Sequence, residues 1–215
     1  MKHFVFVLLS VLLLFSTGYS EDKNIPPADY KGSVAERPIL KQGDRWDYTR
    51  REKVVSCEFM GEKDGQLVFN ITWDDGTKET EFRTSDQNFL KGLDTKGEIH
   101  EEVAPFRGWL SFPLWVGKKW SYTFQTSNTR RASSMSSNID SDVKVVGYEQ
   151  IKVPAGTLWA FKIEEVRKVR GAKKGPGANG IHITAWYNPD IKGSVKIEHD
   201  NDVYNRDLVK FTPAK

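Results

Sequence analysis

The sequence predicts an all-β protein, built as a strongly curved antiparallel sheet or an incomplete β-barrel with little helix. From residue 43 onward, apolar residues alternate with polar ones in one short run after another, the pattern of half-buried strands. Asp-Gly pairs at 64–65 and 75–76 stand between such runs and accept the positive φ angles that close hairpins. No apolar period of 3.6 residues persists, and only residues 89–103 would tolerate a helix.

The first 20 residues are predicted to be a cleaved signal peptide. Lys2 and His3 precede an apolar run at residues 4–15, and small residues precede a cut expected after Ser20. That run is shorter than the roughly 20 residues of a membrane-spanning helix, so we expect no integral span after cleavage; an uncleaved anchor is the alternative. No Cys directly follows the run, so a lipid-modified N-terminus is not expected. The mature protein should be periplasmic or secreted.

Composition excludes several classes of protein. The 215 residues are 38% hydrophobic and 28% charged, with a single Cys, and the mean hydropathy is −0.55. These values exclude a multi-span membrane protein, a disulfide framework and a disordered polyelectrolyte. The formal net charge of +3 falls short of a nucleic-acid-binding footprint, so no nucleic-acid partner is expected.

The elements follow in order along the chain. Residues 21–41 hold three prolines and no periodic apolar face, which predicts an extended arm and not a packed element, and residues 42–215 are expected to form a single β domain. Cys57 belongs to an apolar row and is expected to be buried. The sequence 153–157, Val-Pro-Ala-Gly-Thr, fits a tight turn. The expected strand rows are Trp46 and Tyr48; Val55, Cys57 and Phe59; Leu67, Phe69, Ile71 and Trp73; Trp120, Tyr122 and Phe124; Val143 and Val145; Trp159, Phe161 and Ile163; Ile181, Ile183, Ala185 and Tyr187; Val195 and Ile197; and Leu208 to Phe211.

Three segments interrupt this rhythm. Residues 126–141 are rich in Ser and Asn, and residues 167–180 lead from basic residues into a Gly-rich tip. Both are expected to be long hairpin loops, which either carry specificity or are solvated connectors. Residues 106–115 are apolar without clean alternation, which suggests either a plug or a mobile lid over the open side of the sheet. A plug predicts a closed core, and a lid predicts a ligand.

One motif occurs twice. The segment Gly43–Thr49 recurs as Gly117–Thr123, each with Gly, then Trp three residues later and Tyr five residues later. Each copy releases the chain at Gly and begins a strand with both rings on one face. The recurrence predicts two related halves, at about residues 42–110 and 116–212, although a shared preference for strand starts would also explain it.

Motifs of the second half carry a family resemblance. They are the Gly-x-x-Trp-x-Tyr strand start, the Val-Pro-Ala-Gly-Thr turn at 153–157, and Ala185-Trp186-Tyr187-Asn188-Pro189 ahead of Gly193-Ser194-Val195-Lys196. Together they resemble a family of bacterial exported proteins of unknown function, over residues 117–209. The resemblance implies a strongly curved antiparallel sheet akin to the half-barrels of periplasmic lipoprotein carriers. It supplies no catalytic residue.

No motif for catalysis or metal binding is present. His100, His182 and His199 lack metal-ligand spacing, so neither a metal nor a cofactor is expected. Glu79 and Glu81 share one face of a predicted strand at a separation that glycosidases use, but a solvated hairpin explains them more simply. No nucleophile motif stands out, and the sequence predicts a protein that is not an enzyme.

Aromatic residues make up 12% of the chain, including seven Trp. We expect their rings to line the concave face of the sheet and to accommodate a hydrophobic or lipid-like ligand, or an extended segment of an envelope protein. The alternatives are an envelope carbohydrate-binding module or cryptic hydrolase, and a purely structural or assembly role in which the rings only pack. The expected ligand-binding residues are Trp46, Tyr48, Trp73, Trp120, Tyr122, Trp159, Trp186 and Tyr187.

Overall fold

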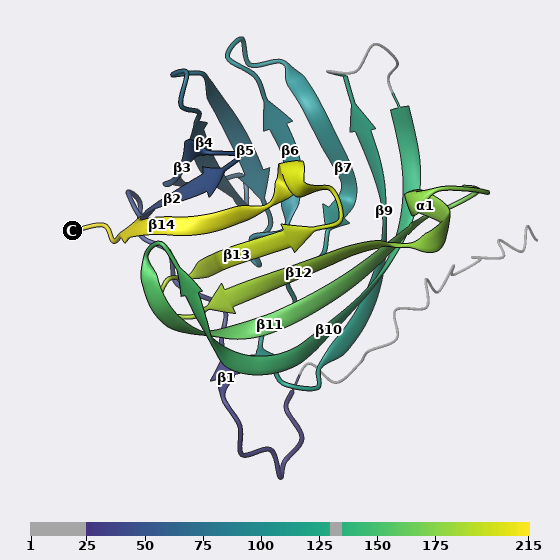
Figure 1. Ribbon diagram of the computed structural model, residues 1–215. Helices are drawn as coiled ribbons and strands as arrows, with labels where there is room; N and C mark the ends of the chain where they lie inside the picture. The colour runs from purple at the N-terminus through teal and green to yellow at the C-terminus, as the bar shows by residue number, and fades with distance from the viewer. Residues whose placement is uncertain (1–24, 130–134) are drawn as a thin grey trace, which may run out of the picture.

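A computed structural model describes residues 25–129 and 135–215, and in this part of the chain twelve antiparallel strands close into a barrel (Figure 1). The predicted signal peptide lies outside the described residues. Each barrel strand pairs with the next barrel strand along the chain, and the last pairs with the first. The strands are β2 (Arg45–Arg50), β3 (Lys53–Lys63), β4 (Gln66–Thr72), β5 (Lys78–Arg83), β6 (Phe89–Leu93), β7 (Ile99–Arg107), β9 (Lys119–Asn128), β10 (Met135–Val153), β11 (Gly156–Val169), β12 (Ile181–Asn188), β13 (Gly193–His199) and β14 (Arg206–Thr212). The predicted all-β class is confirmed, and the barrel is complete.

Four short elements complete the fold. Strand β1 (Val34–Ala35) pairs with β8 (Leu114–Trp115) outside the barrel sheet. The helix α1 (Pro176–Asn179) follows β11, and a 3-10 turn, η1 (Asp202–Tyr204), joins β13 to β14. Within the segment predicted as an extended arm, Ala35 is 2% exposed, whereas the other described residues up to 41 are exposed or half-buried.

Turn chemistry closes the hairpins where the sequence predicts. Asp64 and Gly65 adopt φ angles of 52° and 73° between β3 and β4, the left-handed pair that matches the twist of a hairpin. At the predicted Val-Pro-Ala-Gly-Thr turn, Val153 at the end of β10 pairs with Gly156 at the start of β11. Cys57 is buried, as predicted.

The tolerated helix at 89–103 is wrong, because this segment contains β6 and the first half of β7. The pairing of these strands shifts register twice, between Phe89 and Lys91 and between Gly92 and Leu93. Across the first shift β7 has three more residues than β6, and across the second it has one more, so the two-residue alternation of side chains is lost from the sequence.

The described part of the predicted loop at residues 126–141 is largely strand, whereas in the predicted loop at residues 167–180 only the first three residues are strand and the rest connects β11 to β12 through α1. Residues 126–128 belong to β9, residues 135–141 to β10 and residues 167–169 to β11. The polar composition of β10 led to the loop prediction. The outer side chains of this strand form hydrogen bonds with side chains of β9 instead of packing in a core. Ser121 donates to Asp142 (2.6 Å) and Thr123 to Asp140 (2.9 Å).

Two apolar clusters form the core. The first gathers on β2, β3 and β4 around Trp46, Phe59 and Phe69, with the Phe59 and Phe69 ring centroids 5.3 Å apart. The second joins β10, β11 and β12 to the segment between β7 and β9, and includes Leu114 and Phe161. No helix within residues 25–129 and 135–215 is long and apolar enough to cross a membrane.

Candidate ligand-binding cavity

A cavity of about 710 Å³ lies within the barrel. Its volume falls in the range of pockets that enclose small-molecule ligands. Much of its wall consists of apolar side chains that alternate inward along their strands; these include Trp46, Phe69, Ile71, Ile163, Ile183 and Ile197.

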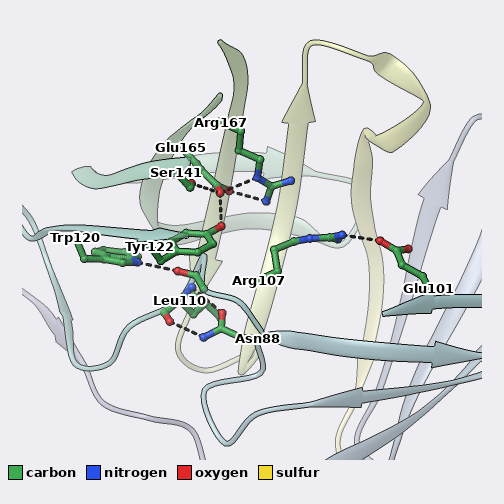
Figure 2. Close-up of polar contacts among 10 residues, drawn as sticks. Asn88, Glu101, Arg107, Leu110, Trp120, Tyr122, Ser141, Glu165 and Arg167 are labelled. Atoms are coloured by element: carbon green, nitrogen blue, oxygen red, sulfur yellow. Dashed lines mark hydrogen bonds and ion pairs between the residues drawn. The ribbon is translucent and has the colours of Figure 1, made fainter. Parts of the chain in front are cut away.

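One end of the barrel is closed by residues 108–113, which we call the plug. The Asn88 side chain donates to the Leu110 carbonyl (2.8 Å) and accepts from the Leu110 amide (2.9 Å), and Leu110 is 2% exposed (Figure 2). The Trp120 indole donates to the Gly108 carbonyl (2.8 Å). Lys118 Nζ donates to the carbonyls of Ser111 (2.5 Å) and Pro113 (2.9 Å). These hydrogen bonds make the segment a plug and not a mobile lid. The plug does not fill the barrel, because the cavity remains between it and the other end.

The cavity reaches the surface at the opposite end of the barrel. Its lining there includes Pro176, Asn201 and Tyr204, all of which are exposed. At the plug end the lining residues Gln87, Leu110 and Gly193 are buried. The cavity is therefore a cup with a closed base and one open mouth, which the connections α1 and η1 border.

A buried carboxylate, Glu165 on β11, organises one wall of the cup (Figure 2). Arg167 donates a hydrogen bond to each carboxylate oxygen of Glu165, from Nε to Oε1 (2.7 Å) and from Nη2 to Oε2 (2.8 Å). The hydroxyls of Tyr122 and Ser141 donate to Oε1. Burial alone would raise the pKa of Glu165, but Arg167 and these hydrogen bonds lower it below its usual value. Glu165 is therefore ionised inside the barrel.

Two further Glu–Arg pairs line the cavity. Arg83 donates to Glu81 through Nη2 (2.6 Å) and Nε (3.0 Å), and its guanidinium lies 4.2 Å from the centroid of the Phe69 ring. Arg107 donates to Glu101 at 2.6 Å. Burial would raise the pKa of Glu81, but Arg83 lowers it, so this carboxylate is also held in its charged form.

The eight predicted ligand-binding rings do not share one face. Trp46, Tyr48 and Trp73 line the cavity. Trp120 and Tyr122 pack against the cluster that contains the plug. Tyr187 belongs to the same cluster and packs edge-on against Phe112 of the plug. The other two lie elsewhere: Trp159 is 50% exposed and stacks on Tyr148, and Trp186 lies against Lys162 and Lys196.

The charged residues of the lining were missed at the sequence level, although a signal for them exists. Glu165 and Arg167 continue the inward row of Ile163 at two-residue spacing, and Glu81 and Arg83 show the same Glu-x-Arg pattern on β5. Following each apolar row past its last hydrophobic residue would have placed these pairs inside the barrel.

The predicted solvated hairpin at Glu79 and Glu81 is wrong. Glu79 is buried and lies 3.3 Å from His100 Nε2 on β7, whereas Glu81 lines the cavity. The two carboxylates face inward together but have different partners. Among residues 25–129 and 135–215, no group of three His, Cys, Asp or Glu side chains is placed to hold a metal ion.

One solved structure shares this fold at low sequence identity, and a second one aligns less well. A protein from Bacteroides fragilis that is assigned as exported and has a YmcC-like fold aligns with a TM-score of 0.50 and 16% identity, over 83% of this chain and 99% of that one. The hypothetical lipoprotein YmcC from Escherichia coli gives a TM-score of 0.48 and 13% identity, over 81% and 87% of the two chains. No family model matches the chain, and no curated protein matches it. The first alignment shows a shared fold alone.

Proposed function

We propose that this protein is a non-enzymatic binding protein that holds an amphipathic, lipid-like ligand inside the barrel. The cup of about 710 Å³ carries this proposal, because it is closed at its base, open at its mouth and walled by both apolar and charged side chains. Apolar surface that leaves water contributes roughly 25 cal/mol per Å², so an alkyl chain inside the cup would supply most of the affinity.

Binding is favoured over hydrolysis by the state of the carboxylates. A glycosidase needs one carboxyl group whose pKa is raised so that it can act as a general acid. Arg83 lowers the pKa of Glu81, and Arg167 lowers the pKa of Glu165, although burial opposes both effects. Both groups therefore lack the proton that a general acid must donate.

Two observations favour an enclosed ligand over the other candidates. The described barrel sheet closes on itself, so an extended partner segment finds no free edge in it for strand addition. A carbohydrate platform needs at least two exposed rings in a line, and of the seven tryptophans, all in the described chain, only Trp159 is exposed.

We place this activity outside the cytoplasm, in a periplasm or a secreted state. The signal-peptide pattern of residues 1–20 supports that location, as does the export assigned to the Bacteroides fragilis protein that shares the fold. Kinship to the periplasmic lipoprotein carriers stays a prediction.

Cavity filling tests the proposal. Ala185 lies inside the cup, so Ala185→Phe should block it, whereas Ala155→Phe at the exposed β10–β11 turn is the matched control. We expect oleyl alcohol or monooleoylglycerol to shift the tryptophan fluorescence of the wild type and of Ala155→Phe, but not of Ala185→Phe. Native mass spectrometry should report the same difference.

Thermal melting confirms that each variant is folded, since overpacking a core typically costs about 1–3 kcal/mol. The proposal fails if no amphipathic probe binds to the wild type, or if a folded Ala185→Phe variant binds as well as the control does.

A further inference from the structure

Two arginines in the lining differ from the other three. Arg83, Arg107 and Arg167 each pair with a glutamate, whereas Arg50 on β2 and Arg206 on β14 have no ion-pair partner among the described residues. Both side chains are half-buried. Burying a charge is costly unless an anion compensates it, so these two side chains call for an explanation.

Strand pairing brings the two unpaired guanidinium groups together. Asp207 pairs with Thr49, so the adjacent residues Arg206 and Arg50 come side by side on neighbouring strands. Both line the cavity and thus share its inner face. Like charges opposite each other in a sheet are destabilising. Burial lowers the pKa of Arg50, and the charge of Arg206 lowers it further.

The nearby carboxylates do not neutralise this pair. Glu81 attracts both guanidinium groups electrostatically, but its hydrogen bonds are with Arg83. Asp200 also lines the cavity and accepts from the His182 amide (2.7 Å), and Asp202 lies 3.9 Å from Arg51. Asp207 follows Arg206 directly along β14, so its side chain points to the outer face of the barrel. The inner face at this position therefore carries an excess of positive charge.

Most of the hydrogen-bond donors of the pair are unused by the described protein. Each guanidinium has five N–H donors. Arg50 Nε donates to the Val203 carbonyl (2.7 Å), and Arg206 Nη2 donates to Ser194 Oγ (3.0 Å). Arg206 Nε is buried and has no hydrogen-bond partner in the described chain. The remaining donors of the pair can therefore reach an acceptor placed in this part of the cavity.

Aromatic rings hold both side chains in place. The Arg50 guanidinium lies 5.2 Å from the centroid of the Trp73 ring and 5.4 Å from that of Tyr204, and the Arg206 guanidinium lies 4.9 Å from that of Tyr48. Such stacking fixes the orientation of the planar guanidinium groups, so their N–H donors are preorganised for an anion. Along β2 the inward row then changes from Arg50 through Tyr48 to Trp46, from charged near the mouth to apolar deeper in the cup.

We propose that the ligand carries an acidic group, a carboxylate or a phosphate, that Arg50 and Arg206 bind together while its apolar part extends along Trp46 and Phe69. This inference rests on the proposed function and names the chemical class of its ligand. Two adjacent guanidinium groups match the bidentate geometry of either anion.

Matched lipid pairs test the acidic group. Oleate is compared with oleyl alcohol, and monooleoyl lysophosphatidate with monooleoylglycerol, by native mass spectrometry and tryptophan fluorescence. We expect the acidic member of each pair to bind about 10- to 100-fold more tightly, the range expected for hydrogen bonds between charged groups. Acetate and inorganic phosphate serve as head groups without a chain, and should bind far more weakly than the lipids.

Single substitutions then locate the recognition. Arg206→Gln and, separately, Arg50→Gln should remove most of the preference for the acidic lipid, because they weaken the binding of the acidic lipid far more than that of the neutral lipid. Lys210→Gln is the control, because it removes one positive charge from an exposed position on β14. Without ligand, Arg206→Gln should melt at the same temperature as the wild type or higher, since it relieves a repulsion, whereas a purely structural arginine would lower the melting temperature.

Each outcome bears on a different claim. Equal binding of acidic and neutral lipids by the wild type overturns this inference but leaves the proposed function standing. The same conclusion follows if the arginine variants lose affinity for the acidic and the neutral lipid to the same extent. Failure of all four lipids overturns the proposed function. Phosphate that binds as tightly as lysophosphatidate would support the acid site and overturn the lipid-like ligand.

Discussion

The two copies of the Gly-x-x-Trp-x-Tyr motif form the same backbone turn. Gly43 donates to the Phe59 carbonyl and Gly117 to the Val145 carbonyl, both at 2.8 Å, with φ angles of 95° and 100°. In each copy the next residue accepts a return bond of 2.9 Å, from Phe59 to Asp44 and from Val145 to Lys118. Register shifts follow at Phe59/Gly61 and at Val145/Gly147.

The side chains within this shared turn have opposite charges and different tasks. Asp44, 0% exposed, accepts from Lys192 Nζ (2.8 Å) and from the amides of Lys41 and Ala214 (both 2.9 Å), so it ties the β12–β13 turn to both ends of the domain. Lys118 instead binds the plug. The two copies of the motif therefore share one backbone geometry. The side chain that follows the glycine, Asp44 or Lys118, determines which segments each turn holds at the base of the barrel. The two-halves hypothesis stays a prediction that this equivalence supports.

Removing Asp44 should have the largest effect. Asp44→Ala leaves Lys192 and two backbone amides without their acceptor, and breaking a buried ion pair from one side costs about 3–5 kcal/mol. Urea unfolding monitored by circular dichroism measures the loss. Glu62→Gln, at an exposed position on β3, is the control, and an Asp44→Ala loss below 1 kcal/mol would contradict the tethering role.

The two motif tyrosines should differ in their contribution. Tyr122 donates to the ionised Glu165, whereas Tyr48 donates to the Ser194 carbonyl at 3.0 Å. Hydrogen bonds to charged groups contribute about 1.5–3 kcal/mol and neutral ones about 0.5–1.5 kcal/mol. Tyr122→Phe should therefore reduce the free energy of unfolding more than Tyr48→Phe does. Equal losses would mean that the charge of Glu165 adds nothing to this bond.

Lys118 should give the barrel a characteristic pH dependence. Burial lowers the pKa of Lys118 to about 8. The unfolded chain keeps this proton up to its ordinary pKa of about 10.4, so between these values the unfolded state binds more protons and stability rises with pH. Lys118→Met should lose about 1 kcal/mol at pH 7, because two hydrogen bonds are lost while a buried charge is relieved. Its denaturation midpoint should also lack the rise between pH 8 and 10; a rise equal to that of the wild type would refute the assignment.

Substitution of either motif tryptophan, Trp46 or Trp120, should cause the smallest change in stability. The two substitutions also distinguish a residue that lines the cavity from one that binds the plug. Each indole donates one hydrogen bond to a carbonyl, from Trp46 to Ile191 (2.7 Å) and from Trp120 to Gly108 (2.8 Å). Replacement of either by Phe should cost about 1 kcal/mol. Trp46 lines the cavity and Trp120 does not, so only Trp46→Phe should weaken the fluorescence response to oleyl alcohol. A larger weakening in Trp120→Phe would place the ligand elsewhere.

Alternation in the sequence was sufficient to predict the β class and many of the strands. It failed where a register shift interrupts the period, as between Phe89 and Lys91, and where the outer face of a strand is held by polar pairs, as at Thr123 and Asp140. Closure of the barrel was not predictable, because it depends on how curvature accumulates over all the strands.

The candidate site was predicted in part. Its rings at Trp46, Tyr48 and Trp73 were named, but its arginines were not. Charged residues in a strand suggest an outward face, and only the partners contributed by other strands reveal that they are enclosed. Arg167 was placed in a basic loop for this reason.

The order of the strands has a consequence for how the molecule assembles. Because every barrel strand pairs with the next one along the chain, each hairpin can form as soon as its second strand is available, and only the junction of β14 with β2 joins distant parts of the sequence. That single closure has the largest loop-closure entropy of any strand pairing in the barrel. The barrel can therefore form strand by strand from its N-terminal side, and its wall is complete only when β14 pairs with β2.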